Sequence, residues 1–288
     1  MVNPPRSLPL THQMIEARRS GRKGLSLTDT PRRLEHPNMN AQLLHWWMRD
    51  YDHVFVVLNP FFRVPGFTPE TTAWGPLRSE ATTPQELEAL LESLGGPQPD
   101  QAPEAFDEII KTTGQPVRWD MIAQALGVSD FRHFARMVWL WVIGAEPPDL
   151  DATLVSRIAR HCRHEGLYKP EEDWLPLVLE PMLVPYFEAL RLDEVTLWDE
   201  TRTSSLDCPV EALHRDEPPV ALMDAPISAI SAPGLLLSWS QDQVTGLLAL
   251  TEEMRQKVDP ARHLEGFWAG AGTSSLVLDQ PRAPALLH

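Results

Sequence analysis

Two spacings of apolar residues divide the chain into a helical middle part and a C-terminal part made of strands. The run Val54–Leu58 is β-branched and aromatic and ends at Asn59-Pro60, which predicts a buried strand. After residue 194, similar short runs predict strands at 195–198, 220–223, 235–239, 244–250, 266–268 and 276–278. Residues 240–243 separate two of these runs and predict a hairpin.

Before residue 194 the apolar residues return at helical spacing. Helices are predicted at 84–94, 103–113, 119–126, 130–143 and 149–165, with two short, proline-broken helices within 170–191. The apolar face of the helix at 149–165 includes Ile158 and Cys162, and Gly166 closes that helix. Cys162 is therefore expected in the core.

This order of elements favours an α+β fold. We expect a helical N-terminal and middle part packed on a mainly antiparallel sheet, which the C-terminal part largely forms. A single domain is predicted over 41–279. Residues 1–40 are rich in proline and arginine and predict a poorly ordered basic arm, and 280–288 predict a flexible tail.

Composition narrows the classes of partner. The 288 residues carry a net charge of −15, with +4 on residues 1–36 and −19 on the remainder. An acidic body repels nucleic acid and attracts basic proteins, so a basic protein is the candidate partner; the alternative is that the acidity only keeps the protein soluble. There is no apolar leader at the N-terminus, no apolar run of about 20 residues and few cysteines. These features predict a soluble cytoplasmic protein without membrane contact.

Motif searches predict no cofactor and no metal ligands. There is no G-x-S-x-G elbow, P-loop, H-E-x-x-H or C-x-x-C. His161 and His164 are spaced to share one side of a helix, but Arg157 and Arg160 lie on the same side. Positive charge disfavours a metal cation there, so we expect a solvated basic stripe near the helix C-terminus. If the stripe is functional, it favours an anionic ligand or an acidic partner segment.

Candidate catalytic and aromatic binding residues come mainly from the C-terminal part. Acidic groups such as Glu171-Glu172-Asp173 are expected on solvated faces, because adjacent carboxylates do not converge. If the chain is an enzyme, the candidate acid, base or nucleophile-activating residues are Asp199, Asp207, His214 and His263. Trp198 and Trp268 are candidate binding residues, because tryptophans near strand ends often anchor ligands or partners.

Four segments carry a family resemblance. They are VFVVLNPFFRVPG (54–66), GQPVRWDMIAQALG (114–127), LYKPEEDWLPLVLEPML (167–183) and LEGFWAGAGTSS (264–275). In this order they resemble an uncharacterised bacterial family, the domain of unknown function with serial number 2711, over about 54–276. The resemblance implies a bacterial cytoplasmic context, and it implies no activity or site residues.

Two functions remain open on these observations. The favoured one is a non-enzymatic protein-binding module with an acidic surface, of the immunity or antitoxin kind, by analogy with acidic proteins that neutralise basic toxins. The alternative is a hydrolase without a recognisable motif, whose site is a pocket near the C-terminal strands.

Overall fold

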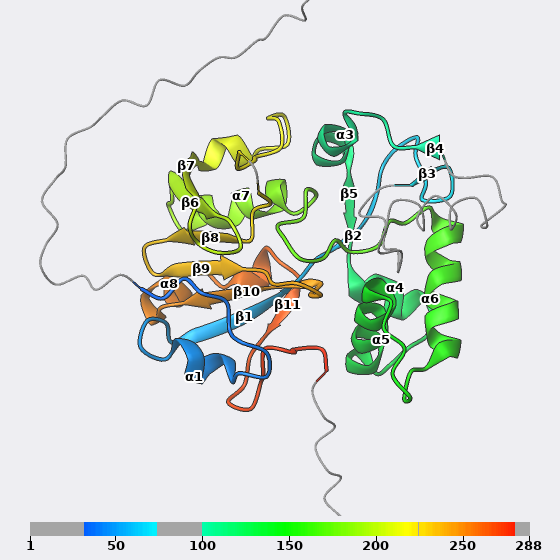
Figure 1. Cartoon of the computed structure of the whole chain (residues 1–288), viewed down its shortest axis with the longest axis horizontal. Helices are drawn as coiled ribbons and strands as arrows, with labels where there is room; N and C mark the ends of the chain where they lie inside the picture. Colours follow the sequence, from blue (N-terminus) through cyan, green and yellow to red (C-terminus); the bar gives the residue numbers. More distant parts are fainter. Residues whose placement is uncertain (1–31, 74–99, 224, 280–288) are drawn as a thin grey trace, which may run out of the picture. The chain divides into compact units, whose positions relative to one another are not determined.

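Seven strands form one antiparallel sheet in the computed structural model, which describes residues 32–73, 100–223 and 225–279 (Figure 1). One strand comes from the N-terminal part, and the others follow residue 193. The strands are β1 (His53–Leu58), β6 (Glu194–Trp198), β7 (Ser205–Pro209), β8 (Ala229–Ala232), β9 (Leu235–Ser238), β10 (Thr245–Leu250) and β11 (Gly266–Trp268). The predicted α+β class, with a sheet formed largely by the C-terminal part, is confirmed.

The strand order is β11-β1-β10-β9-β8-β6-β7, so β11 and β7 are the two edges of the sheet. Every neighbouring pair is antiparallel. The predicted hairpin is β9–β10, in which Leu237 lies opposite Leu248. Strand β1 is inserted between β10 and the edge strand β11, which joins the N-terminal part to the sheet (Figure 1).

The central strands are buried on both faces, and this explains their continuous apolar runs. On β1, Val54 and Val56 belong to one core cluster, whereas Phe55 and Val57 belong to another. The same alternation holds on β9 and β10, because successive side chains in a strand point to opposite faces. One sheet therefore separates two hydrophobic cores.

The first core packs the sheet against helices from the N-terminal and middle parts. Among the described residues, four helices contribute side chains to this first core. Asp130 and Asp151 cap the two long helices, and Gly144 and Gly166 end them in the left-handed conformation. Cys162 is buried in this core as predicted. The helices are α1 (Leu43–Trp47), α4 (Trp119–Ala125), α5 (Phe131–Ile143) and α6 (Ala152–Glu165).

The second core lies on the opposite sheet face. It contains apolar residues of α7 (Glu180–Ala189), the 3-10 helix η1 (Val210–Leu213) and α8 (Glu252–Lys257). A further 3-10 helix, η2 (Pro260–Arg262), follows α8. Instead of two broken helices, 170–191 holds one helix, α7, which keeps Pro185 inside it.

Two small two-stranded sheets and one further helix are separate from the main sheet. Strands β2 (Phe61–Arg63) and β5 (Gln115–Val117) pair antiparallel, and β3 (Thr72–Ala73) and β4 (Asp100–Gln101) pair parallel. Helix α3 (Phe106–Thr113) contributes Phe106 and Ile110 to a third, smaller core cluster.

Some predicted elements differ from the structure. Residues 220–223 and 276–278 are not strands, because short apolar runs also occur in turns and loops that pack on a core. The helix predicted at 84–94 lies outside the described residues, as do most of the arm and the tail. The compact unit begins at Arg33, and the half-buried His36, within the region predicted as an arm, has its Nδ1 2.9 Å from Ser238 Oγ.

Candidate functional site

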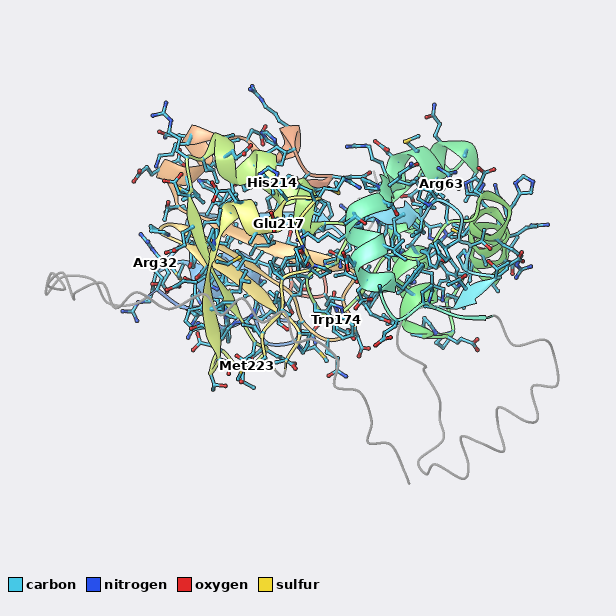
Figure 2. The ribbon with its side chains drawn as sticks, turned by 90° about the horizontal axis from the view of Figure 1, so that it is seen from above. Arg32, Arg63, Trp174, His214, Glu217 and Met223 are labelled. Carbon is cyan, nitrogen blue, oxygen red and sulfur yellow. The ribbon has the colours of Figure 1, made fainter. Side chains whose placement is uncertain are left out.

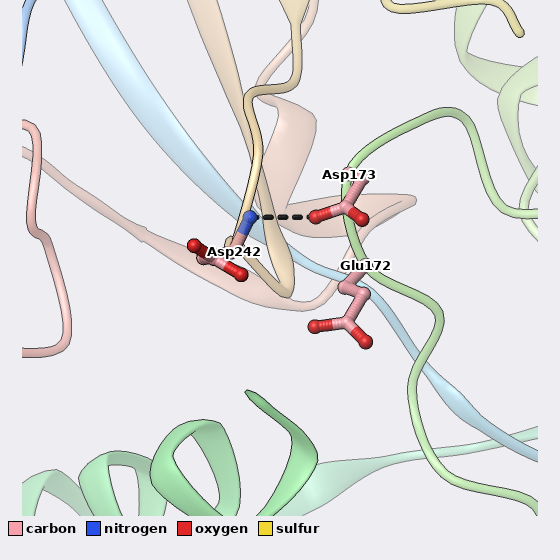
Figure 3. A group of neighbouring side chains, drawn as sticks. All are labelled: Glu172, Asp173 and Asp242. Atoms are coloured by element: carbon pink, nitrogen blue, oxygen red, sulfur yellow. Dashed lines mark hydrogen bonds between the residues drawn. The ribbon is translucent and has the colours of Figure 1, made fainter. Parts of the chain in front are cut away.

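Three carboxylates from distant segments meet beside the β9–β10 hairpin (Figure 3). Glu172 and Asp173 come from the irregular segment before α7, and Asp242 comes from the hairpin turn. The Asp242 backbone N–H donates to Asp173 Oδ1 at 2.6 Å, and the Asp173 N–H donates to the Gln243 carbonyl at 3.1 Å. Asp173 and Asp242 both have positive φ, 76° and 58°, so two tight backbone bends bring them together.

This carboxylate cluster has the donor set of a hard-cation site. One oxygen from each residue lies within 4.8 Å of the others, and carboxylate oxygens are the ligands that Ca²⁺ and Mg²⁺ prefer. Acidic groups also gather at such distances without an ion, so the arrangement alone assigns no metal. The sequence carried no signal for this meeting, because about 70 residues separate Asp242 from Asp173.

The expectation that Glu171-Glu172-Asp173 is a solvated group is wrong for its first two members. Glu171 and Glu172 are buried. Glu171 Oε2 accepts from the Leu177 N–H at 3.0 Å, and burial raises the pKa of this carboxyl well above its ordinary value. The segment is bonded to residues that flank strands of the main sheet, because Asn59 donates to the Glu171 carbonyl at 2.7 Å and the Asp173 N–H donates to the Gln243 carbonyl. Local charge does not indicate such contacts.

A buried ion pair joins α3 to α7. Lys111 and Glu180 are both almost fully buried, with Nζ 2.8 Å from Glu180 Oε2. Lys111 Nζ also donates to the carbonyls of Ala212 and Pro218, at 2.9 and 2.7 Å, so all three of its donors are used. Burial raises the pKa of Glu180 to about 7, although Lys111 acts in the opposite direction. The pair holds the η1 segment in place.

Exposed carboxylates gather where α7, β6, β7 and η1 meet. These elements pack on one another, and the Val210 N–H donates to the Asp193 carbonyl at 3.0 Å. Residues 188–217 contain nine acidic and three basic residues, a net charge of −6 within the total of −15. We use the term acidic face for the exposed carboxylates around this edge of the sheet, namely Glu188, Asp193, Glu194, Asp207 and Glu211; Glu194 and Asp207 point to the side of the sheet opposite α7 and η1.

The four candidate catalytic residues each have partners of their own. Asp199 closes the β6–β7 turn: its Oδ1 accepts from the Thr203 N–H at 2.8 Å. Burial acts to raise the pKa of Asp199, but hydrogen bonds from Thr201 and its neighbours hold it below the ordinary value. Asp207 accepts from Thr196 Oγ1 at 2.9 Å on the neighbouring strand.

The two candidate histidines lie at the ends of 3-10 helices. His214 follows η1, with Nε2 3.7 Å from a Glu188 carboxylate oxygen, and its carbonyl accepts from the Glu217 N–H (Figure 2). His263 follows η2 and packs on Tyr186 at 5.9 Å between ring centroids. Of the four candidates, only Asp207 belongs to the acidic face.

The basic stripe and Trp198 also have defined surroundings. Arg157, Arg160 and His164 are exposed on α6, and His161 is half-buried. Arg157 donates to the Leu126 carbonyl, and His164 Nδ1 lies 3.1 Å from Glu165. Trp198 donates to Ser231 Oγ at 2.8 Å and packs against the first core. The side chains of the stripe lie on one helix, α6.

Trp268 lines a shallow pocket of about 180 Å³ beside β11. The Arg255 guanidinium lies 5.2 Å from the Trp268 ring, and the His53 ring packs edge-on at 6.1 Å. His53 Nε2 is hydrogen-bonded to Glu252, and hydrogen bonds from Gln256 and His53 hold the pKa of Glu252 below its ordinary value. The lining residues are Arg255, Gln256, Asp259 and Trp268.

Comparison with known proteins places this α+β chain in a family. The model described as "Protein of unknown function (DUF2711)" matches residues 39–276, so the chain belongs to this family and the predicted resemblance is confirmed. No curated protein and no solved structure matches the chain. Among the described residues, no helix has both the length and the apolar character needed to cross a membrane.

Proposed function

We propose that this protein is a non-enzymatic protein-binding module of the immunity or antitoxin kind, acting in the bacterial cytoplasm on a basic partner. The observation that carries the proposal is the acidic face on α7, β6, β7 and η1. Four of its carboxylates belong to helices and strands that pack on the second core, and Asp193 lies in the bend between α7 and β6. These side chains are therefore already held in place before a partner binds, which lowers the entropy cost of binding.

Charge is the physical basis of recognition in this proposal. A surface of one sign attracts a partner of the opposite sign, speeds encounter and rejects partners of the same sign. The Lys111–Glu180 pair supports the proposal indirectly, because it holds the η1 segment on which Glu211 lies. The immunity or antitoxin assignment rests on analogy with acidic inhibitors of basic toxins.

The experiment is capture of the tagged full chain from its native host at low salt, followed by mass spectrometry. A stoichiometric basic protein that dissociates at high salt is the expected result. The variant Glu194→Gln, Asp207→Asn, Glu211→Gln should weaken its binding at least about tenfold, because three attractive charges are lost. A monomer without any partner at low salt would contradict the proposal.

The matched control neutralises three exposed acidic residues elsewhere: Glu104→Gln, Glu108→Gln and Glu146→Gln. Its net charge equals that of the first variant, so it should bind the partner nearly as well as the unaltered protein. Equal weakening by both variants would show that total charge, and not the acidic face, decides binding.

A hydrolase with its site at the Trp268 pocket is a second candidate, favoured by the His53–Glu252 pair beside it. Among the four candidate catalytic residues, His263 is nearest in sequence to a pocket residue, Asp259. A screen of ester, phosphoester and peptide substrates tests this alternative. Activity that falls with both His53→Gln and Asp259→Asn but not with Lys257→Gln would support it. No turnover of any substrate would leave the binding module as the better proposal.

A further inference from the structure

Strand β7 is an edge whose outward backbone groups have no strand beside them in the described part of the chain. The Asp199 N–H donates to the Ser204 carbonyl, and the Val210 N–H donates to the Asp193 carbonyl. Together with the β6–β7 register, these bonds turn the backbone of Leu206 and Cys208 toward β6. The N–H and C=O groups of Ser205 and Asp207 therefore point away from the sheet.

The side chains of β7 provide two kinds of contact. Leu206 is 47% exposed and lies on the same sheet face as Cys208, which is buried in the second core. Asp207 lies on the other face, where it accepts from Thr196. An extended segment beside β7 would thus meet an apolar side chain on one face and a carboxylate on the other.

We propose that β7 receives an extended basic segment of a partner protein as an eighth, antiparallel strand. This inference rests on the proposed function and specifies how the acidic face binds. The main-chain groups of Ser205 and Asp207 supply the strand hydrogen bonds, Leu206 contacts an apolar side chain of the segment, and Asp207 lies next to a basic one. The antiparallel direction follows the remainder of the sheet.

Charge decides between possible occupants of this edge. A second copy of the chain paired through β7 would place Asp207 and the neighbouring Glu194 and Glu211 against the same residues of its partner. Like charges opposite one another are destabilising. A basic segment instead meets the opposite charge of Asp207 on β7, with Glu194 on β6 and with Glu211 on the η1 helix that follows β7, which is why it is the occupant we propose.

The probe is a synthetic peptide in which lysine and valine alternate over about six residues, a usual strand length. In an antiparallel pair, peptide residues opposite Ser205 and Asp207 have their side chains on the same sheet face as Ser205 and Asp207. The lysines are placed at these positions, where their backbone N–H groups point at β7. Backbone N-methylation of the lysines should weaken binding at least about tenfold. N-methylation of the valines should leave binding nearly unchanged, and it is the matched control, because both peptides have the same charge.

Variants of the full chain give an independent measurement. Ser205→Pro removes an outward N–H without removing a hydrogen bond to β6 and without changing the charge. It should weaken peptide binding about three- to tenfold. Ser205→Ala keeps the N–H and should bind like the unaltered protein. Circular dichroism checks that both variants fold. If Ser205→Pro does not fold, the methylated peptides still test the proposal on the unaltered chain.

The outcomes separate this inference from the proposed function. Equal affinity of the two methylated peptides would overturn strand addition, and it would leave the proposed function standing if binding still falls with Asp207→Asn and with salt. Absence of salt-dependent binding to any of the lysine peptides would contradict both. A complex of two chains that dissociates with Ser205→Pro would overturn the proposed occupant in favour of a second copy.

Discussion

The two edge strands of the main sheet differ in length and in the charges around them. Strand β7 has five residues, its outer side carries no neighbouring strand in the described chain, and its surroundings are acidic. Strand β11 has three residues and is followed by a turn. Trp268 of β11 contacts Phe55 edge-on at 5.2 Å between ring centroids, and both signs of charge surround it. Short edges with mixed charge protect against unwanted pairing, so β7 is the edge suited to a partner.

The two edges also depend on different buried carboxylates. Beside β11, the Glu265 carboxylate accepts from the N–H groups of Trp119 and Asp120, at 2.8 and 3.0 Å, and joins the edge to α4. Burial raises the pKa of Glu265. Beside β7, Glu180 is paired with Lys111, which holds the segment after η1. The comparison can therefore be tested by disturbing each support separately.

The largest effect is expected from Lys111→Met. This change leaves the buried Glu180 without its cation, so that it must either keep a buried negative charge or take up a proton, and the free energy of unfolding should fall by about 3–5 kcal/mol. Denaturant unfolding followed by tryptophan fluorescence measures it. The control is Lys257→Met on α8, whose ammonium lies 2.8 Å from Glu253 at an exposed position. That change should cost less than about 1 kcal/mol. Equal losses would show that burial does not distinguish the two ion pairs.

The next effect is a pH dependence that arises near β7. Burial raises the pKa of Glu180 from 4.5 to about 7 in the folded protein. Between these values the folded state holds a proton that the unfolded state has released, so the free energy of unfolding falls as pH rises. The contribution is full below pH 4.5, is lost through about pH 7, and amounts to about 3 kcal/mol.

The measurement for this pH dependence is denaturant unfolding from pH 4 to 8 on the unaltered chain and on Glu180→Gln. The pKa of Glu171 is raised chiefly by its own burial, with Glu180 a smaller cause, so most of the Glu171 contribution cancels in the difference curve. The difference between the two proteins should change with pH in the direction given above. A difference that stays constant over this range would contradict the raised pKa of Glu180.

A smaller effect is expected at the opposite edge from Gly266→Ala. A Cβ atom at this position would lie 1.9 Å from the Val56 carbonyl oxygen, and that atom belongs to the backbone of β1. Strand β11 would have to shift, at a cost of about 1–3 kcal/mol in unfolding free energy. Thermal unfolding measures the loss. Gly270→Ala has its nearest atom at 3.9 Å and should be nearly neutral, so similar losses for both would contradict this account of β11.

The smallest effect is expected from Leu206→Ala. Leu206 is about half exposed, so its truncation should change the unfolding free energy by less than about 0.5 kcal/mol. The corresponding change on the other edge, Trp268→Ala, removes the contact with the Phe55 ring and should cost about 1 kcal/mol. Denaturant unfolding of both variants measures the contrast. A large loss for Leu206→Ala would mean that this side chain already supports the fold.

Local patterns predicted the elements of the fold better than its sites. Val54–Leu58 and the β9–β10 hairpin were predictable because strands buried on both faces require continuous apolar runs. The carboxylate cluster was not predictable, because Glu172 and Asp173 meet Asp242 only through the chain's tertiary path. The acidic character of 188–217 is visible in the sequence, but the packing of α7, β6, β7 and η1 that gathers it is not.

The sequence by itself determined the α+β class, the central strands and the long helices α5 and α6, because periodic apolar residues and helix caps act over a few neighbouring positions. The tertiary structure alone decided which charges are buried and which strands are edges. Lys111 and Glu180 look like ordinary surface residues in sequence, and their burial depends on carbonyls of Ala212 and Pro218. The free energy of a charge is set by the groups that surround it in space, and these come from distant segments.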